Sequence, residues 1–227
     1  AIRTVGEAFP GRFVAGLGIS HPPAVAAGGA DYRAPLTTMA DHLAAMAQAT
    51  HASPEPAEPV PVVLGALRRR MLELSRDAAD GAHPYFVPVE HTRRAREILG
   101  PDRLLAPELA VALEPDPAEA RRLARQHTGG FYLEAPNYVE NLRWLGFDDD
   151  DFADGGSDEL VDAVVAWGDE ETIVGRIQEH LEAGADQVCL QPVTTVRPLE
   201  DGPDHAALDV LRRLAPALRD AGLLTGI

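Results

Sequence analysis

The sequence predicts an α/β protein whose strands run parallel to one another. Short apolar runs alternate along the chain with segments whose apolar residues recur at helical spacing, every three or four positions. The apolar runs are continuous, as expected for strands that are covered by helices on both faces. At 227 residues the chain is long enough for one large domain or two small ones. A (β/α) barrel and an open doubly wound sheet both fit this pattern, and both place ligands at the carboxyl ends of the strands.

The first half of the chain contains four predicted strands with helices between them. The expected strands are the apolar runs at residues 12–18, 60–67, 82–87 and 104–113. The expected helices cover residues 35–49, 68–80 and 89–100. Residues 22–34, rich in Pro, Ala and Gly, are predicted to form a loop. Residues 52–59 hold three prolines and are predicted to form a stiff surface connector.

The second half is predicted to begin and end with regular helices around an irregular middle. A helix over residues 116–127 opens with acidic residues, which favour a helix N-terminus. Shorter helices are expected at 137–145 and 157–167, and the run of four aspartates between them is read as a solvated loop. A helix that stops at Gly184 leads into a fifth strand, and a final helix follows. These last two elements are expected at residues 186–193 and 206–220.

Composition excludes several classes of partner. The formal net charge is −16, so nucleic acid and anionic membranes are not expected as partners. No apolar run is long enough to span a bilayer. The single cysteine, Cys189, allows no intrachain disulfide, which fits a cytoplasmic protein, and it reads as a small buried hydrophobe. The eight histidines are scattered without metal-ligand spacing, so no metal site is expected.

The stretch GRFVAGLGISHPP places two polar residues directly after the first predicted strand. Ser20 and His21 lie where either architecture would hold a ligand. Gly16 and Gly18 have no side chains, so a flat ring or another backbone could approach closely. His21 can donate, accept or transfer a proton near neutral pH. An equally good interpretation is that the glycines ease strand packing and His21 caps a loop.

The second predicted strand runs into GALRRRM, residues 65–71. Small residues that lead into a helix N-terminus can bind an anion through free backbone N–H groups. Arg68, Arg69 and Arg70 add positive charge there, although a solvated arginine cluster explains them almost as well. A dinucleotide-binding loop is not expected at GLGISH, because His21 replaces the third glycine and prolines follow in place of a helix start.

Other chemically notable residues have less specific patterns. His83 and Tyr85 alternate on the third predicted strand and so share a face, which points either into a barrel or toward the outer helices. Trp144 and Trp167 are interpreted as core or lid packing. The chain has neither the G-x-S-x-G elbow nor a Walker loop.

The quoted stretches together resemble one known family. GRFVAGLGISHPP, followed by PLTTMADHL, is similar to the luciferase-like monooxygenases, and most similar to an actinobacterial branch that is predicted to use the deazaflavin coenzyme F420. The resemblance continues through VVLGALRRRMLELSRDAADGAHPYFVPVEHTRRAREILGP, NYVENLRWLGF and the segment that ends at QVCLQPV. It covers nearly the whole chain.

The resemblance implies a (β/α)8 TIM barrel of the bacterial luciferase type. Residues 12–18 would be its fourth strand and residues 186–192 its eighth, so the first three β/α units have no counterpart here. Residues 1–227 would then form a single, partial barrel domain, with the family's insertion after the seventh strand at about 129–168. We expect a homodimer, because an open barrel edge invites pairing with another chain.

The resemblance also implies a cofactor and a site. The expected activity is that of an F420-dependent oxidoreductase, with hydride transfer between the deazaflavin and a small organic substrate. The alternatives are an FMN-dependent monooxygenase and a non-catalytic reduced-barrel flavoprotein or partner subunit. His21 would be the catalytic residue. The cofactor-binding residues would be Gly18, Ser20, Gly65, Ala66, Leu67 and Arg68. Many relatives have Gly-Pro where this chain has Arg68-Arg69, so the phosphate contacts are expected to differ.

Overall fold

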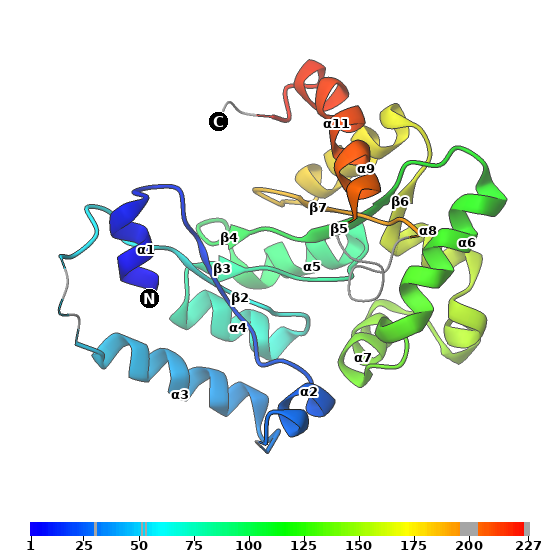
Figure 1. Ribbon diagram of the computed structural model, residues 1–227. Helices are drawn as coiled ribbons and strands as arrows, with labels where there is room; N and C mark the ends of the chain where they lie inside the picture. Colours follow the sequence, from blue (N-terminus) through cyan, green and yellow to red (C-terminus); the bar gives the residue numbers. More distant parts are fainter. Residues whose placement is uncertain (30, 51, 53, 196–203, 225–227) are drawn as a thin grey trace. The chain divides into compact units, whose positions relative to one another are not determined.

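The computed structural model describes residues 1–29, 31–50, 52, 54–195 and 204–224. The chain divides into two compact units, each with its own parallel sheet (Figure 1). The first unit comprises residues 1–85 and 94–106, and the second comprises residues 86–93 and 107–227. None of the described helices is long and apolar enough to cross a lipid bilayer.

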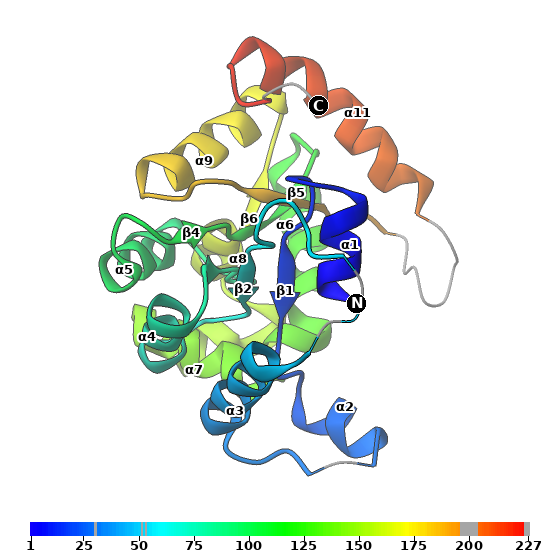
Figure 2. The same ribbon diagram turned by 90° about the vertical axis from the view of Figure 1, so that its left-hand side faces the viewer.

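The first unit contains a four-stranded sheet in chain order. Its strands are β1 (Ala15–Leu17), β2 (Val62–Leu64), β3 (Gly81–Ala82) and β4 (Leu104–Leu105). Every neighbouring pair is parallel, as the alternation of apolar runs and helices predicts. Figure 2 shows β1 and β2 side by side, and Ala15 is in register with Val62.

Helices join the strands of the first unit and supply its core. They are α1 (Ile2–Ala8), α2 (Pro22–Ala27), α3 (Pro35–Gln48), α4 (Arg69–Ala78) and α5 (Val89–Leu99), the last of which is shared with the second unit. Both α2 and α3 begin with proline, whose fixed φ and missing N–H suit the first turn of a helix. Met39 of α3, Leu64 of β2 and Ala79 form a buried cluster.

The second unit contains a three-stranded parallel sheet in the order β6-β5-β7. The strands are β5 (Glu108–Ala112), β6 (Val165–Trp167) and β7 (Cys189–Pro192). The helices are α6 (Pro117–His127), α7 (Pro136–Leu145), α8 (Asp158–Val164), α9 (Glu170–Glu182) and α11 (His205–Asp220). A π-helical turn η1 (Thr128–Tyr132) and a 3₁₀ segment η2 (Asp149–Gly155) lie between them.

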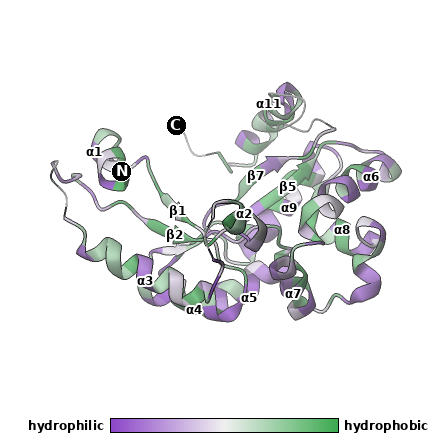
Figure 3. Ribbon diagram, turned by 60° about the horizontal axis from the view of Figure 1, so that its bottom comes forward, coloured by the Kyte–Doolittle hydropathy of each residue, from purple (hydrophilic) through white to green (hydrophobic). Residues whose placement is uncertain are grey.

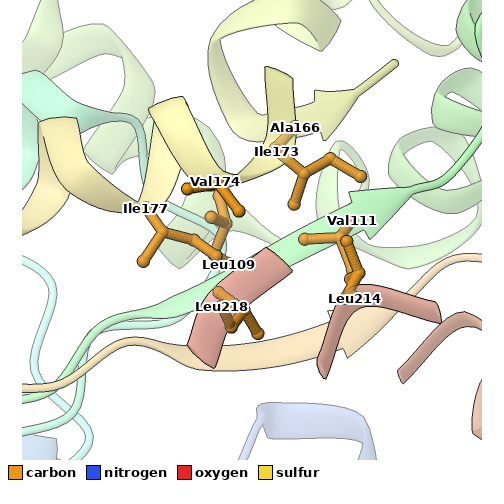
Figure 4. Close-up of a cluster of buried hydrophobic side chains, with 8 residues drawn as sticks. All are labelled: Leu109, Val111, Ala166, Ile173, Val174, Ile177, Leu214 and Leu218. Atoms are coloured by element: carbon orange, nitrogen blue, oxygen red, sulfur yellow. The ribbon is translucent and has the colours of Figure 1, made fainter. Parts of the chain in front are cut away.

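Strand β5 is buried along its whole length and organises the second core. Leu109 and Val111 point toward α9 and α11, where they meet Ile173 and Leu214 (Figure 4). Successive side chains of a strand point to opposite faces, so Glu108, Ala110 and Ala112 face away from these helices. In Figure 3 strand β5 is coloured as apolar, whereas α6 and α7 also carry hydrophilic residues.

The predicted strand at 104–113 is in fact two strands in different sheets. The Ala106 N–H donates to Ala82 in the first sheet, whereas the Pro107 carbonyl accepts from the Cys189 N–H in the second. The N–H groups that pair with the first sheet alternate along the strand, at Leu104 and Ala106, and the change of partner falls at Pro107, directly after them. Such a change depends on long-range pairing and leaves no mark on the apolar pattern.

Three other expectations were wrong. The predicted strand at 82–87 ends at Ala82, and Phe86 farther along it adopts a left-handed φ of +57° that no strand accommodates. The predicted helix at 157–167 stops at Val164 and continues as β6. Together with the division of 104–113 into two strands, this gives the described residues seven strands and not five. The predicted loop at 22–34 contains α2. Ala30 of that segment and Ser53 of the predicted connector lie outside the described residues.

Candidate functional site

The carboxyl ends of β1, β2 and β3 form one edge of the first sheet. The Gly65 N–H donates to the Leu17 carbonyl at 2.8 Å, and the His83 N–H donates to the Leu64 carbonyl at 2.8 Å. A Cβ built on Gly65 would lie 3.8 Å from the Cα of Gly18. The backbones of the predicted site residues Gly18 and Gly65 therefore lie side by side at this edge.

Gly18 leaves open space at the edge. A Cβ built there would meet nothing within 4 Å in the described part of the chain. Its φ is outside the left-handed range, so the backbone conformation does not require glycine. Neither close packing nor backbone geometry accounts for the missing side chain, and its effect is to leave the edge accessible to a flat group.

Ser20 and His21 carry the chain from β1 into α2. Ser20 is exposed and has a left-handed φ of +65°, which is uncommon for a residue other than glycine. His21 is the N-cap residue of α2, with extended φ and ψ of −127° and 151°. Its half-buried ring makes no capping hydrogen bond to the helix. His21 therefore does not cap α2 through its side chain.

Residues 65–68 occupy the matching position after β2. Gly65 is exposed, Ala66 is buried and Leu67 is half-buried. Arg68 is exposed and is the N-cap residue of α4, as His21 is of α2. The first N–H groups of a helix have no intrahelical acceptor, and with Arg68 they give this turn positive potential. Arg69 is paired with Glu73 at 3.7 Å, on the side of the helix.

His83 and Tyr85 stand after β3 at the same edge. Ring nitrogen Nδ1 of His83 lies 2.6 Å from the carbonyl oxygen of Ala106. The two rings meet edge to face, with centroids 6.1 Å apart. Strand alternation was the wrong reason for grouping them, since β3 ends at Ala82, but the structure does bring them together.

The second unit holds a buried carboxyl group that the sequence interpretation missed. Glu108 is only 3% exposed, and its Oε2 accepts a hydrogen bond from the Phe86 N–H at 3.0 Å. Burial raises the pKa of Glu108 to about 7. Glu108 is in register with Cys189. The pKa of the Cys189 thiol is raised mainly by burial and to a smaller extent by the neighbouring Glu108 carboxyl group. The only signal in the sequence was an acidic residue inside the apolar run ELAVAL.

Aromatic residues gather around Phe86. Its ring stacks on Tyr132 at 4.3 Å and meets Tyr138 edge to face at 5.7 Å. Burial raises the pKa of Tyr138 to about 12 and lowers that of His127 to about 4. Trp144 packs edge to face on His91, and Trp167 donates to Asp162, so both tryptophans have packing roles.

A hollow of the first unit lies away from the predicted site, and the described residues form no metal centre. Within the described ranges, no three His, Cys, Asp or Glu side chains are arranged to hold a metal ion. A hollow of about 1030 Å³ is lined by α1, the end of α3 and the residues that lead into β2, among them Arg3, Met46 and Val60. It adjoins the amino ends of the strands, whereas ligands of parallel sheets bind at the carboxyl ends.

Comparison with solved structures supports the fold. An F420-dependent secondary alcohol dehydrogenase, in complex with an F420-acetone adduct, aligns with a TM-score of 0.68 and 14% identity, over 96% of this chain and 73% of that one. The F420-dependent tetrahydromethanopterin reductase from Methanopyrus kandleri aligns at 0.58 and 16%, over 95% and 77%. The FMN-bound oxygenating constituent of 3,6-diketocamphane monooxygenase from Pseudomonas putida aligns at 0.55 and 16%, over 95% and 73%.

These likenesses establish the fold alone, because the identities are low. They confirm the predicted class, an α/β fold of the luciferase-like TIM-barrel type with parallel strands. No curated protein matched the sequence. The model of the luciferase-like monooxygenase family, however, matches residues 1–187, which is most of the chain. The chain therefore belongs to the luciferase-like monooxygenase family of enzymes.

Proposed function

We propose that the protein is an F420-dependent oxidoreductase that transfers hydride between the deazaflavin and a small organic substrate. The observation that carries the proposal is the bare edge formed by Gly18 and Gly65, with His21 beginning the next helix. The fold is shared with two enzymes whose names specify F420, which supports this cofactor without determining it.

The residues at the edge fit a tricyclic ring with an anionic tail. A ring laid over Gly18 and Gly65 would meet backbone only, since neither residue has a side chain. Ser20 is exposed beside it and offers a hydroxyl group. The phosphate of the tail would lie at the first turn of α4, against free N–H groups and Arg68. These residues would contact one side of the cofactor. In a full barrel, other strands would form the remaining side of the site.

His21 is proposed to act on the substrate. The bound deazaflavin would supply a centre that accepts or donates hydride, and the protein would bind, orient and exclude water. His21 would hold the substrate oxygen and exchange a proton with it, which requires a group that titrates near neutral pH. His21 lies past the end of β1 and not in the turn proposed to bind the phosphate. Its loss should therefore lower substrate turnover more than cofactor affinity.

A second candidate is an FMN-dependent monooxygenase. The fold is also shared with a monooxygenase component in complex with FMN. The edge residues would contact a ring through their backbone, which either ring system would fit. A third candidate is a non-catalytic flavoprotein or partner subunit. The three differ in which cofactor the protein binds and in whether bound cofactor is turned over.

The deciding experiment measures cofactor binding to the purified protein. F420 or FMN is added, and binding is detected by fluorescence quenching. We expect saturable quenching of F420 and weaker binding of FMN. Tight binding of FMN alone would favour the monooxygenase, and binding of neither would overturn both enzymatic proposals. His21→Ala should keep the Kd for F420 within about threefold while turnover falls about 100-fold, the size expected when one acid-base group is removed. Equal losses in both would contradict the proposed role of His21.

A further inference from the structure

His83 connects three strand ends of the first unit. Its backbone N–H donates to Leu64, the last residue of β2, at 2.8 Å. Its ring nitrogen Nδ1 lies 2.6 Å from the carbonyl oxygen of Ala106, which directly follows β4. Both bonds are at the carboxyl edge that also carries Gly65. The imidazole is therefore held in a fixed place at the edge where the cofactor is proposed to bind.

The partner of Nδ1 decides the tautomer of the ring. A carbonyl oxygen can only accept a hydrogen bond, so Nδ1 must carry the hydrogen and donate it to Ala106. In a neutral imidazole the lone pair is then on Nε2. Among the described residues this is the only hydrogen bond of the ring, and the side chain is half-buried. Nε2 is thus available as a proton acceptor.

The orientation of the ring follows the general arrangement of catalytic bases. A base that transfers protons is usually held by a third group that fixes its second nitrogen, so that the free nitrogen faces the reactant. In this chain Ala106 takes that part through its backbone, and Tyr85 holds the ring edge to face at 6.1 Å. The ring of His83 is therefore oriented by two neighbours, a backbone carbonyl and an aromatic ring.

We propose that His83 is a second proton-transfer residue of this site and that its Nε2 receives a proton from the substrate. The proposal rests on the proposed function and adds the class of substrate, which carries an O–H or N–H on the carbon that loses hydride. The deazaflavin would take the hydride with its two electrons, and Nε2 of His83 would take the O–H or N–H proton, while His21 holds and polarises the substrate oxygen or nitrogen from its other side. A C=O or C=N bond forms, and the imidazolium then returns its proton to water.

Two substitutions separate proton transfer from a structural role. His83→Asn keeps an N–H close to the position of Nδ1, so it can still donate to Ala106, but it has nothing at Nε2. His83→Ala removes both groups. If His83 only links strand ends, turnover should be kept in His83→Asn and lost in His83→Ala. If His83 transfers protons, turnover should fall by about 100-fold or more in both variants.

The tautomer can be measured without cofactor. We expect ¹⁵N NMR of histidine-labelled wild-type protein to show one imidazole protonated at Nδ1 and bare at Nε2 at neutral pH. The signal is assigned to His83 by its absence from His83→Asn. We expect both variants to bind F420 within about threefold of wild type in Kd while turnover of an alcohol or amine panel is lost, as for removal of an acid-base group.

Three results would overturn the inference. They are an Nε2–H tautomer at His83, turnover by His83→Asn within about threefold of wild type, and loss of turnover in His83→Ala alone. The proposed function fails separately, through absent F420 binding by the wild-type protein. That result would leave the tautomer measurement unaffected, so the two failures can be told apart.

Discussion

The side chain of Glu108 and the backbone of Phe86 are joined by a hydrogen bond of 3.0 Å, in which Oε2 accepts from the N–H. Phe86 has a left-handed φ of +57°, which is strained for a bulky residue and needs support from its surroundings. Its ring is buried and stacks on Tyr132. The carboxyl group at the start of β5 therefore helps to hold an aromatic cluster in place.

The first prediction concerns stability at alkaline pH. Burial raises the pKa of Glu108 from 4.5 to about 7, so folding favours the protonated carboxyl group. The contribution of Glu108 to the free energy of unfolding should be greatest below pH 4.5. It should be lost as the pH rises from 4.5 to about 7. The loss is about 3 kcal/mol. Glu108→Gln, which imitates the protonated form, should be more stable than wild type at pH 8 by a similar amount.

Urea unfolding followed by tryptophan fluorescence measures this effect directly. Trp144 and Trp167 both lie in the second unit, so the signal reports on the unit that contains Glu108. Glu134→Gln is the matched control, because Glu134 is exposed, and it should leave the pH profile unchanged. A Glu108→Gln protein less stable than wild type at pH 8 would mean that the carboxylate is favoured in the folded state.

The second prediction concerns acid. His180 is fully buried, and its Nδ1 lies 2.8 Å from the Thr92 hydroxyl group. Burial, with smaller contributions from Arg176 and His91, lowers the pKa of His180 to about 4. Because the unfolded chain binds the proton more readily, stability should fall as pH drops from 6.5 to about 4, by about 3 kcal/mol.

Substitution shows how much of the acid sensitivity is due to His180. His180→Gln should make the decline between pH 6.5 and 4 shallower, while His127, whose pKa is also lowered to about 4, preserves part of it. The exposed His205 serves as the control, and His205→Gln should have the wild-type slope. An unchanged slope in His180→Gln would contradict a buried neutral imidazole.

The third prediction tests the core shown in Figure 4. Leu214 of α11 is fully buried against β5 and α9, so Leu214→Ala should lower the free energy of unfolding by about 3–5 kcal/mol. Leu211 lies on the same helix but is 37% exposed, and Leu211→Ala should cost about 1 kcal/mol or less. Urea unfolding by tryptophan fluorescence measures both. Similar losses in the two variants would show that α11 does not pack on the sheet through Leu214.

The fourth prediction tests the open space at Gly18. Gly18→Val should leave the melting temperature nearly unchanged, because a Cβ there meets nothing within 4 Å and the backbone φ suits any residue. F420 binding should weaken at least about tenfold, since a branched side chain would occupy the face on which the ring is proposed to lie. Fluorescence quenching gives the Kd, and Gly16→Ala, also in open space within β1, is the control. Wild-type affinity in Gly18→Val would move the ring away from this edge.

Much of the fold could be predicted from the sequence because its signals are local. Apolar runs located the strands near β1, β2 and β7, and helical spacing located α3, α6, α9 and α11. The family resemblance is confirmed by the match over residues 1–187. The errors fall where local pattern and tertiary pairing disagree, as at Pro107, where a single apolar run serves two sheets, and at Val165, where α8 passes directly into β6.

By itself the sequence determined most of the alternation of strands and helices, the family, and the residues that follow β1 and β2, because these depend on neighbours a few positions apart. Only the tertiary structure decided that Gly18 lies against Gly65, that the His83 ring is hydrogen-bonded to Ala106, and that the buried Glu108 accepts a hydrogen bond from Phe86. These contacts depend on the register of parallel strands and on the exclusion of water around a carboxyl group. Both are set by packing between segments that are distant in the chain, and neither is encoded in any one stretch of it.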